Sequence, residues 1–477
     1  MRTIALLVAL LAAACTVGPD YAAPQAATPA DWAEPLPPGA VAQPDEAALA
    51  RWWTAFGDPE LDALVEAAVA RNRDLAAAGA RVREARALRA AAGAGWLPSL
   101  DSSAGVTRTH RSGNAFPAGP VGTTSDLHTV GLDAAWELDL FGGVRRTVEA
   151  ADADLAAAQE DQRAVLVTLL GEVGLSWVDA RAARRRLAIA RGALAAQQET
   201  ADLTRARRDA GLANDLDLAR AEALVAGTQA TLPALQEQRA RAGHSLDVLT
   251  GGLPGTAQAL LGDEPRVPPP PARVPLGLPS DLLRRRPDLR RAERELAAAT
   301  ARIGVAQADR WPKFTLTGAL GRSSQVTRNL FEKDSEYWAL GAGLDWPLFE
   351  GGRLAAEVEA ADARAEQALR AWEQAVLVAL QETHDALTGF GREQERRAAL
   401  ERAAAAQRET AQLARERHAA GLSDFLEVLD AERSLLTAED AVALSEQALA
   451  ADAVALYKAL GGGWEQPVEA GEAAGAP

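Results

Sequence analysis

Few residues in this chain could carry out covalent or metal chemistry. The five histidines are spread along the chain without the spacing of metal ligands, at His110, His128, His244, His384 and His418. Taken singly, each is better explained as a surface or loop histidine than as a ligand. No glycine-rich loop that could hold a phosphate accompanies the basic run at 284–286. The sequence therefore predicts no enzyme, no cofactor and no metal site.

The single cysteine, Cys15, lies where lipid chemistry is expected. It follows one early arginine, an apolar run and three alanines in MRTIALLVALLAAAC, which resembles a bacterial lipoprotein signal, although Ala12 replaces the usual leucine. The resemblance implies that residues 1–14 are removed and that Cys15 becomes a lipidated first residue. Thr16, rather than aspartate, follows it, which implies transport to the outer membrane. A non-lipidated secretory signal with a chance cysteine is the alternative.

Composition limits the kind of protein. The chain has 477 residues, 48% hydrophobic and 24% charged, so it can bury a core. A net charge of −16 argues against nucleic acid as a partner, because phosphate binding needs a basic face. One cysteine rules out an intramolecular disulfide. Past the signal, no run reaches the roughly 20 apolar residues of a membrane-spanning helix, so a membrane could be crossed only with strands.

The chain is an internal duplication built on two long helices. Between Gly143 and Gly211 there is no proline, and the stretch consists mainly of strong helix formers. The same design returns between Gly352 and Gly421, and QQET at 197–200 reappears as QRET at 407–410. At about 1.5 Å per residue, each helix would be roughly 100 Å long. Helices of this length indicate a coiled coil or a helical barrel.

A pair of strands with one apolar face precedes each long helix. Residues 128–140 alternate strictly between apolar and polar or small side chains, and 99–111 alternate more weakly across an intervening loop. In the second half, 314–320 and 338–348 alternate in the same way around a polar loop at 323–336. Strands of about ten residues with one apolar face are typical of transmembrane barrels, with Trp136, Trp338 and Trp346 suited to an aromatic girdle.

These patterns divide the chain into six segments. They are a signal peptide (1–14), an extended proline-rich arm (15–57), a first repeat (58–250, hairpin 99–140, long helix 144–210), a proline-rich linker (251–279), a second repeat (280–464, hairpin 313–348, long helix 353–420) and a disordered tail (465–477). One helix of about 35 residues should lead into each hairpin, and a shorter helix should follow each long one, with Pro233 as a kink in the first. The predicted fold class is α+β and mostly α.

Four strands cannot form a closed barrel alone, because lipid tolerates no open sheet edge. Eight strands from two chains would be filled by side chains, whereas twelve from three chains would leave a lumen. A homotrimer is therefore expected. A soluble four-stranded patch on a coiled-coil protein is the alternative.

Four longer motifs carry a family resemblance. They are GPDY shortly after Cys15, RWWTAFGDPEL at 51–61, PSDLLRRRPD at 279–288 and LYKALGGGW at 456–464. With them the chain resembles the TolC-like outer membrane factors, in their lipoprotein or NodT-type branch. The resemblance implies a trimeric outer-membrane β-barrel continued by a periplasmic α-helical barrel. It also implies two partners, a periplasmic adaptor and an inner-membrane pump of the RND type.

The resemblance assigns the ends of the long helices to adaptor contact. The family's tip motif corresponds to Gly211 and Leu212 in the first repeat and to Gly421, Leu422 and Ser423 in the second, with alanine before each glycine where the family has valine. A glycine can take the left-handed conformation that turns a helix end. That need would exist with or without an adaptor, so a simple helix cap is the alternative.

Just past the second tip, FLEVLDAERS places Leu426, Asp430 and Arg433 on one helical face. The resemblance implies that the leucine and aspartate line a periplasmic gate and that the arginine helps to hold it closed. An ordinary solvated ion pair is the alternative. The first repeat has Leu216 and Arg220 at the matching positions, so any gate differs between the two hairpins.

The predicted function is a passive exit duct for small molecules in a tripartite efflux pump, located in the outer membrane. Two alternatives remain. One is a lipid-anchored periplasmic coiled-coil scaffold without a pore, and the other is a duct for type I protein secretion.

Overall fold

The computed structural model describes residues 16–26, 28–33, 35–110, 112, 124–271 and 273–465. Cys15 and the predicted signal peptide lie outside the described residues, as does the predicted tail from residue 466 onwards. The chain divides into two compact units, one of residues 1–25, 82–158 and 292–372 and the other of residues 26–81, 159–291 and 373–477.

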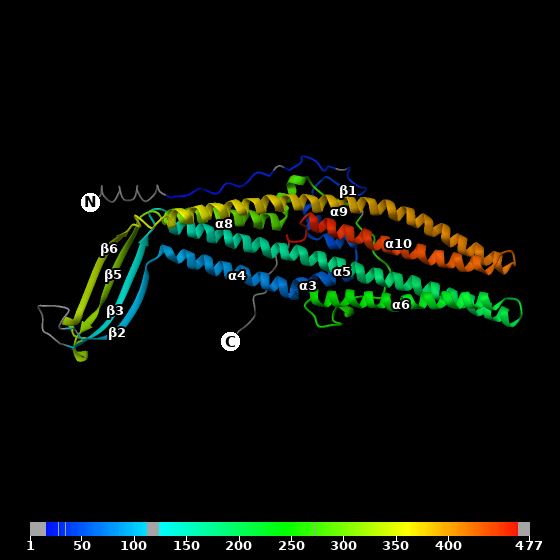
Figure 1. Cartoon of the computed structure of the whole chain (residues 1–477), viewed down its shortest axis with the longest axis horizontal. Helices are drawn as coiled ribbons and strands as arrows, with labels where there is room; N and C mark the ends of the chain where they lie inside the picture. The colour runs from blue at the N-terminus through cyan, green and yellow to red at the C-terminus, as the bar shows by residue number, and fades with distance from the viewer. Residues whose placement is uncertain are drawn as a thin grey trace. The chain divides into compact units, whose positions relative to one another are not determined.

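The long helix and the shorter helix that follows it occur once in each half of the chain, as the duplication predicts (Figure 1). Two helices have 67 residues each, α5 (Gly143–Asp209) and α9 (Arg353–Ala419), and two have 35 residues each, α6 (Asp215–Leu249) and α10 (Phe425–Ala459). Pro233 does not end α6. The remaining α-helices are α2 (Glu46–Ala50), α3 (Pro59–Arg71), α4 (Arg73–Gly93), α7 (Leu282–Arg285) and α8 (Pro287–Ala308). The predicted fold class, mostly helical with an internal duplication, is confirmed.

One antiparallel sheet in the first unit contains the four predicted strands, β2 (Ser99–His110), β3 (Thr124–Leu138), β5 (Lys313–Ser324) and β6 (Glu336–Asp345). Their order is β2-β3-β5-β6, so the two hairpins join through β3 and β5. The register pairs Leu132 with Ser102 and with Leu320, and Leu320 with Trp338. Opposed residues share a face, so the even-numbered, mainly apolar residues of all four strands lie together.

The helix that leads into the first hairpin is broken, contrary to the prediction of one helix. Asn72 has extended backbone angles and separates α3 from α4. Its side-chain oxygen accepts the N–H of Leu75 (2.9 Å), and its Nδ2 donates to the carbonyl of Leu249 (3.0 Å). The break is thus fixed by a hydrogen bond to α6, and the sequence alone does not show this partner.

Replacing Asn72 with alanine is expected to lower the free energy of unfolding by about 1–2 kcal/mol, because α4 loses its cap and the partly buried carbonyl of Leu249 loses its donor. Asn72→Asp keeps the acceptor and loses only the donor, so it should lose less. Loss of helical circular dichroism on heating measures both. If the alanine variant melts at the wild-type temperature, the cap contributes nothing.

The predicted extended arm over 15–57 is wrong for its last part. Residues 46–56 form α2 and the 3₁₀ helix η1 (Trp52–Phe56), and their large apolar side chains are buried. The predicted linker is also not free, since β4 (Val274–Pro275) pairs in parallel with β1 (Ala40–Val41). Composition predicted an extended arm and a proline-rich linker, because proline content does not reveal a distant partner.

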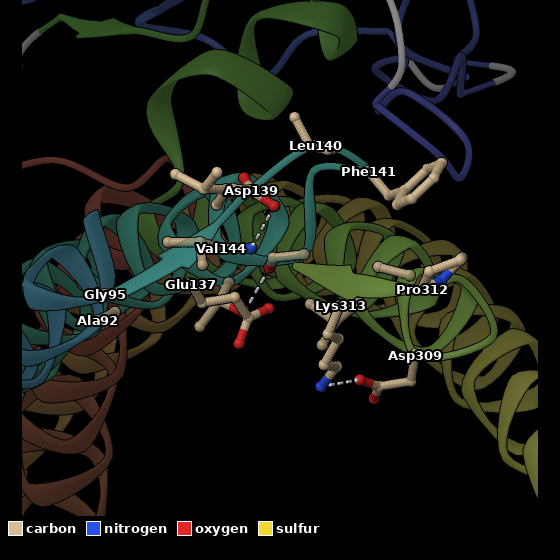
Figure 2. Close-up of a pocket in the computed structure, with 15 residues that line it drawn as sticks. Ala92, Gly95, Glu137, Asp139, Leu140, Phe141, Val144, Asp309, Pro312 and Lys313 are labelled. Atoms are coloured by element: carbon tan, nitrogen blue, oxygen red, sulfur yellow. Dashed lines mark hydrogen bonds and ion pairs between the residues drawn. The ribbon is translucent and has the colours of Figure 1, made fainter. Parts of the chain in front are cut away.

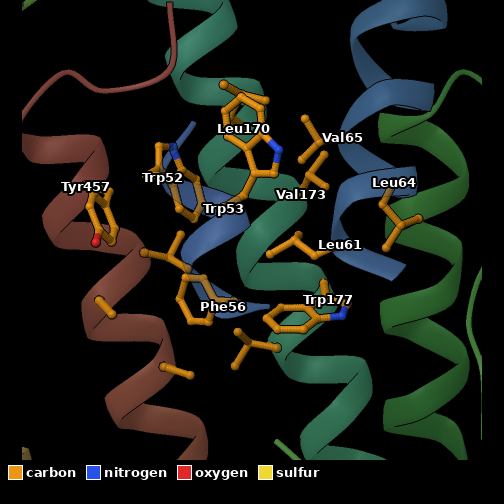
Figure 3. Packing of buried hydrophobic residues seen from close by; sticks show 14 of the residues in the cluster. Trp52, Trp53, Phe56, Leu61, Leu64, Val65, Leu170, Val173, Trp177 and Tyr457 are labelled. Carbon is orange, nitrogen blue, oxygen red and sulfur yellow. The ribbon is translucent and has the colours of Figure 1, made fainter. Parts of the chain in front are cut away.

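Three of the motifs that carry the resemblance contribute to the core of the second unit, with Trp52, Leu282 and Tyr457 among its residues. Figure 3 shows two of the motifs there, at Trp52 and Tyr457. Trp52 stacks on Tyr457 with ring centroids 5.4 Å apart, and Phe56 meets Trp177 edge-on at 5.7 Å. Nearby, Trp464 donates from its indole N–H to the carbonyl of Arg285 (2.9 Å). These motifs therefore join the chain's two halves.

Candidate functional site

Both tip turns lie in the second unit, and both are built in the same way. The N–H of Leu212 donates to the carbonyl of Arg207 (2.8 Å), and that of Gly211 to Arg208 (2.9 Å). In the second tip, Leu422 donates to Arg417 and Gly421 to His418, both at 2.9 Å. Gly211 and Gly421 have φ values of 74° and 72°. Each tip is thus a Schellman turn, which needs a residue that tolerates positive φ.

The two predicted tip leucines, Leu212 and Leu422, are among the exposed large hydrophobic side chains. A Cβ built on Gly211 or Gly421 would meet no atom within 4 Å. Each tip therefore presents one large apolar side chain to solvent, next to a glycine with open space around it.

The tips differ in how the next helix begins. Asn214 caps α6 by accepting the N–H of Asp217 (2.8 Å), whereas Asp424 makes no side-chain cap on α10. At the second tip, Nδ1 of His418 lies 3.2 Å from the carbonyl of Ser423, a contact that holds the turn but does not cap α10. Its ring also lies 5.3 Å from that of Phe425. The two tips are therefore not interchangeable.

His418 also joins the tips to each other. Its Nε2 lies 3.2 Å from Nη1 of Arg207 on α5. Because the guanidinium can only donate, Nε2 accepts, and Nδ1 donates to Ser423. The sequence prediction of an isolated surface histidine is therefore incomplete: this one bridges two hairpins. Its position three residues before Gly421 could have placed it at the tip turn from the sequence.

Of the predicted gate residues, all three lie on the exposed side of α10. Arg433 and Asp430 form an ion pair at 2.5 Å, with side chains 70% and 61% exposed, and Leu426 is exposed as well. An exposed pair of this kind contributes at most about 1 kcal/mol to stability. The three residues therefore lie on one face of α10, and none of them is buried.

Glu432 is a residue in this region that the sequence prediction missed. Its side chain is only 2% exposed and accepts from Nε of Arg415 on α9 at 3.0 Å. The hydroxyl of Thr200 on α5 donates to the same oxygen at 3.2 Å. Glu432 therefore ties α10 to both long helices. Its spacing from Phe425 and Val428 places it on the buried face of α10, and this spacing could have identified it from the sequence.

The three predicted girdle tryptophans lie at both ends of the sheet. Trp338 is near the start of β6, while Trp136 and Trp346 are near the ends of β3 and β6, respectively. The indole N–H of Trp136 donates to the carbonyl of Trp96 (3.1 Å), and that of Trp346 to Arg310 (3.3 Å). Two of the three thus tie a strand end to the helix end before it, once in each repeat.

A cavity of about 280 Å³ lies beside the turn from β3 into α5 (Figure 2). Asp139 caps α5 by accepting the N–H groups of Val144 (3.2 Å) and Arg145 (2.9 Å). Across the cavity Lys313 pairs with Asp309 at 2.9 Å. These charged groups are already paired, so the cavity is a structural feature of the junction.

Within the described residues, no cluster of three or more histidine, cysteine, aspartate or glutamate side chains could hold a metal ion. None of the described helices is long and apolar enough to cross a membrane.

Comparison with known proteins identifies the family. The outer membrane efflux protein family matches residues 64–252 and 278–462. Nodulation protein T of Rhizobium leguminosarum bv. viciae is 34% identical over 98% of this chain and 94% of its own length. The pyoverdine export outer membrane protein OpmQ of Pseudomonas putida is 37% identical over 92% of this chain and 93% of its own.

Solved structures agree. The outer-membrane channel OprN is 39% identical and superposes with a TM-score of 0.87 over 94% of this chain and all of its own. The open MtrE channel of Neisseria gonorrhoeae is 29% identical with a TM-score of 0.80 over 94% of this chain and 99% of its own. The predictions of a NodT-type factor, of an outer-membrane location and of a role in efflux are confirmed. The chain belongs to the outer membrane efflux protein family.

Proposed function

We propose that three copies of this chain assemble into the outer-membrane exit duct of a tripartite efflux pump, which passively conducts small molecules from an adaptor and inner-membrane pump to the outside. The observation that carries the proposal is the four-stranded sheet. Its even-numbered face exposes Leu100, Leu132, Leu320, Trp338 and Leu340. Among the described strands, β2 and β6 each pair on one side only. Two open edges and an exposed apolar face suit closure with further copies in lipid.

The tryptophans fit this assignment in spacing. Trp338 and Trp346 are eight residues apart along one strand and its end. At about 3.4 Å per residue they span roughly 27 Å along the strand. At the tilt of about 40° found in outer-membrane barrels this is roughly 20 Å along the membrane normal, slightly less than their apolar band of about 25 Å. We assign Trp338 to the outer girdle, and Trp136 and Trp346 to the inner one.

The tips and the α10 face complete the proposal. We assign Leu212 and Leu422, with the turns that present them and Ser423, to contact with the adaptor. We assign Leu426, Asp430 and Arg433 to a periplasmic gate, formed where symmetry copies meet. The exposure of Leu212, Leu422, Leu426, Asp430 and Arg433 supports their assignments. The hydroxyl oxygen of Ser423 is buried, so that residue would contact the adaptor through the turn it belongs to.

Small-molecule export is preferred to protein secretion. The names of two relatives refer to pyoverdine export and to toluene efflux. We propose that no chemistry on the substrate takes place and that Cys15 carries the lipid.

The decisive experiment is single-channel recording on detergent-solubilised protein whose oligomer mass is measured in the same preparation. Conducting trimers are expected. Non-conducting monomers or rods would favour the periplasmic scaffold. If deleting the gene abolished only the release of a secreted protein, with drug susceptibility unchanged, the secretion duct would replace the efflux duct.

Asp430→Ala is expected to raise open-channel conductance, because the short ion pair to Arg433 that would order the constriction is lost. Stability should change by no more than about 1 kcal/mol, since the pair is exposed. Glu439→Ala is the matched control, because it breaks another ion pair of α10, that with Arg408 at 2.6 Å. Equal conductance in wild type and the Asp430 variant would remove the gate assignment.

A further inference from the structure

The GPDY motif that follows Cys15 is not used by the duct, the tips or the gate. In the first unit, residues 16–20 lie against the start of α5, at Arg146, and against the last turns of α8, at Gly304. The N–H of Val17 donates to the carbonyl of Phe141 (3.1 Å), in the turn that precedes α5. The hydroxyl of Tyr21 donates to Glu293 on α8 (3.1 Å). This segment is therefore docked, unlike an ordinary chain terminus.

Arg146 on α5 is the centre of the docking site. Its side chain is only 4% exposed. Nε donates to the carbonyl of Val17 and Nη2 to that of Gly18, both at 3.1 Å. Nη2 also contacts Asp20 at 2.7 Å, and Nη1 contacts Glu149 at 2.7 Å. Three of these four contacts go to the segment directly after Cys15, so the guanidinium recognises that segment by its backbone and by one carboxylate.

Three glycines allow the close approach. Gly18 has a φ of 92°, and a Cβ there would lie 2.4 Å from Cα of Gly304 on α8. A Cβ on Gly304 would in turn lie 2.7 Å from Cγ of Arg146. Gly142 has a φ of 83°, and a Cβ there would lie 2.8 Å from Cγ2 of Thr16. The site thus requires glycine on the docked segment and on both surfaces that receive it.

We propose that Arg146, Gly142 and Gly304 form an intramolecular receptor, the N-terminal clamp, that fixes residues 16–20 at the turn between β3 and α5. Thr16 is bonded directly to Cys15, so the clamp sets the point from which a lipid on Cys15 extends. The inference rests on the proposed lipidation. That point lies at the same end of β3 as Trp136, so the anchor would enter the membrane at the inner girdle. Arg146 is then a positioning residue that couples the anchor to the body of the duct.

The test is hydrogen–deuterium exchange of the Val17 amide in the full-length protein, solubilised as assembled from membranes. Arg146→Gln is expected to speed exchange at Val17 at least about tenfold, because two carbonyl contacts and the carboxylate contact are weakened. Arg302→Gln is the matched control: Arg302 also forms an ion pair with a carboxylate of α5, that of Asp154, in the same unit. It should leave Val17 unchanged. Equal exchange in wild type and Arg146→Gln would overturn the clamp.

If Arg146→Gln fails to assemble, Asp20→Asn removes only the exposed carboxylate contact and should still speed exchange at Val17 several-fold. Mass spectrometry of the N-terminal peptide tests the anchoring role, and a peptide without acyl chains would overturn it. Cys15→Ala should leave Val17 protected, since the clamp does not need the lipid. Conductance is recorded on the same samples. Conducting trimers with an unprotected Val17 would refute the clamp alone, whereas non-conducting protein with a protected Val17 would refute the duct alone.

Discussion

Trp52→Ala is expected to lower the free energy of unfolding of the second unit by about 3–5 kcal/mol, the range for removing a large aromatic side chain from a core. Trp52 is 1% exposed. Besides stacking on Tyr457, it meets Trp53 and Phe56 edge-on, with ring centroids 6.0 and 6.2 Å away. The substitution would leave a cavity where the motif at 51–61 packs against the motif at 456–464, so the two halves of the chain would lose a shared contact.

The temperature at which helical circular dichroism is lost measures this effect. All variants are heated at the same scan rate, because unfolding of a solubilised membrane protein is irreversible and its apparent melting temperature depends on that rate. Leu253→Ala, at an exposed position of the same unit, is the control and should melt like wild type. A Trp52 variant that melted together with this control would show that the three motifs do not form a cooperative core.

Gly421→Pro is expected to abolish efflux while the trimer survives. Proline fixes φ near −65°, whereas Gly421 has a φ of 72°, so the turn cannot form with proline. Proline also removes the N–H that donates to His418. The displaced Leu422 should weaken adaptor binding at least about tenfold, or about 1.4 kcal/mol. Drug susceptibility of cells and pull-down of the adaptor measure the two effects.

Gly227→Ala on α6 is the control for this substitution. A Cβ at Gly227 meets nothing within 4 Å and its backbone is helical, so alanine should be neutral or slightly stabilising. Gly211→Pro imposes the same strain on the first tip and shows whether both tips are needed. Normal efflux by the Gly421 variant would mean that the second tip does not dock the adaptor.

The sequence predicted what depends on local periodicity. Two-residue alternation gave the apolar face of the sheet, because side chains of a strand alternate regardless of its partners. The turn glycines Gly211 and Gly421 were found because a helix end with positive φ favours glycine strongly. Asp430 and Arg433 were placed on one helical face by spacing alone.

What the sequence did not predict depends on distant partners. The break at Asn72 is fixed by Leu249, and the burial of Trp52 depends on Tyr457. The roles of His418 and Glu432 come from Arg207 and Thr200, more than 200 residues away in each case. Spacing within one helix shows which face a residue is on, but not which helix covers that face.

The unpaired outer strands of the sheet also affect how the protein must be made. A single chain that has folded β2 and β6 but has not met its partners presents two rows of free backbone N–H and C=O groups beside exposed leucines. Such edges pair readily with any other extended chain and so promote aggregation. Newly made chains therefore need either rapid assembly or a chaperone that shields these strands. Overproduction should yield misassembled chains first, because mispairing rises with concentration faster than membrane insertion can remove the monomers.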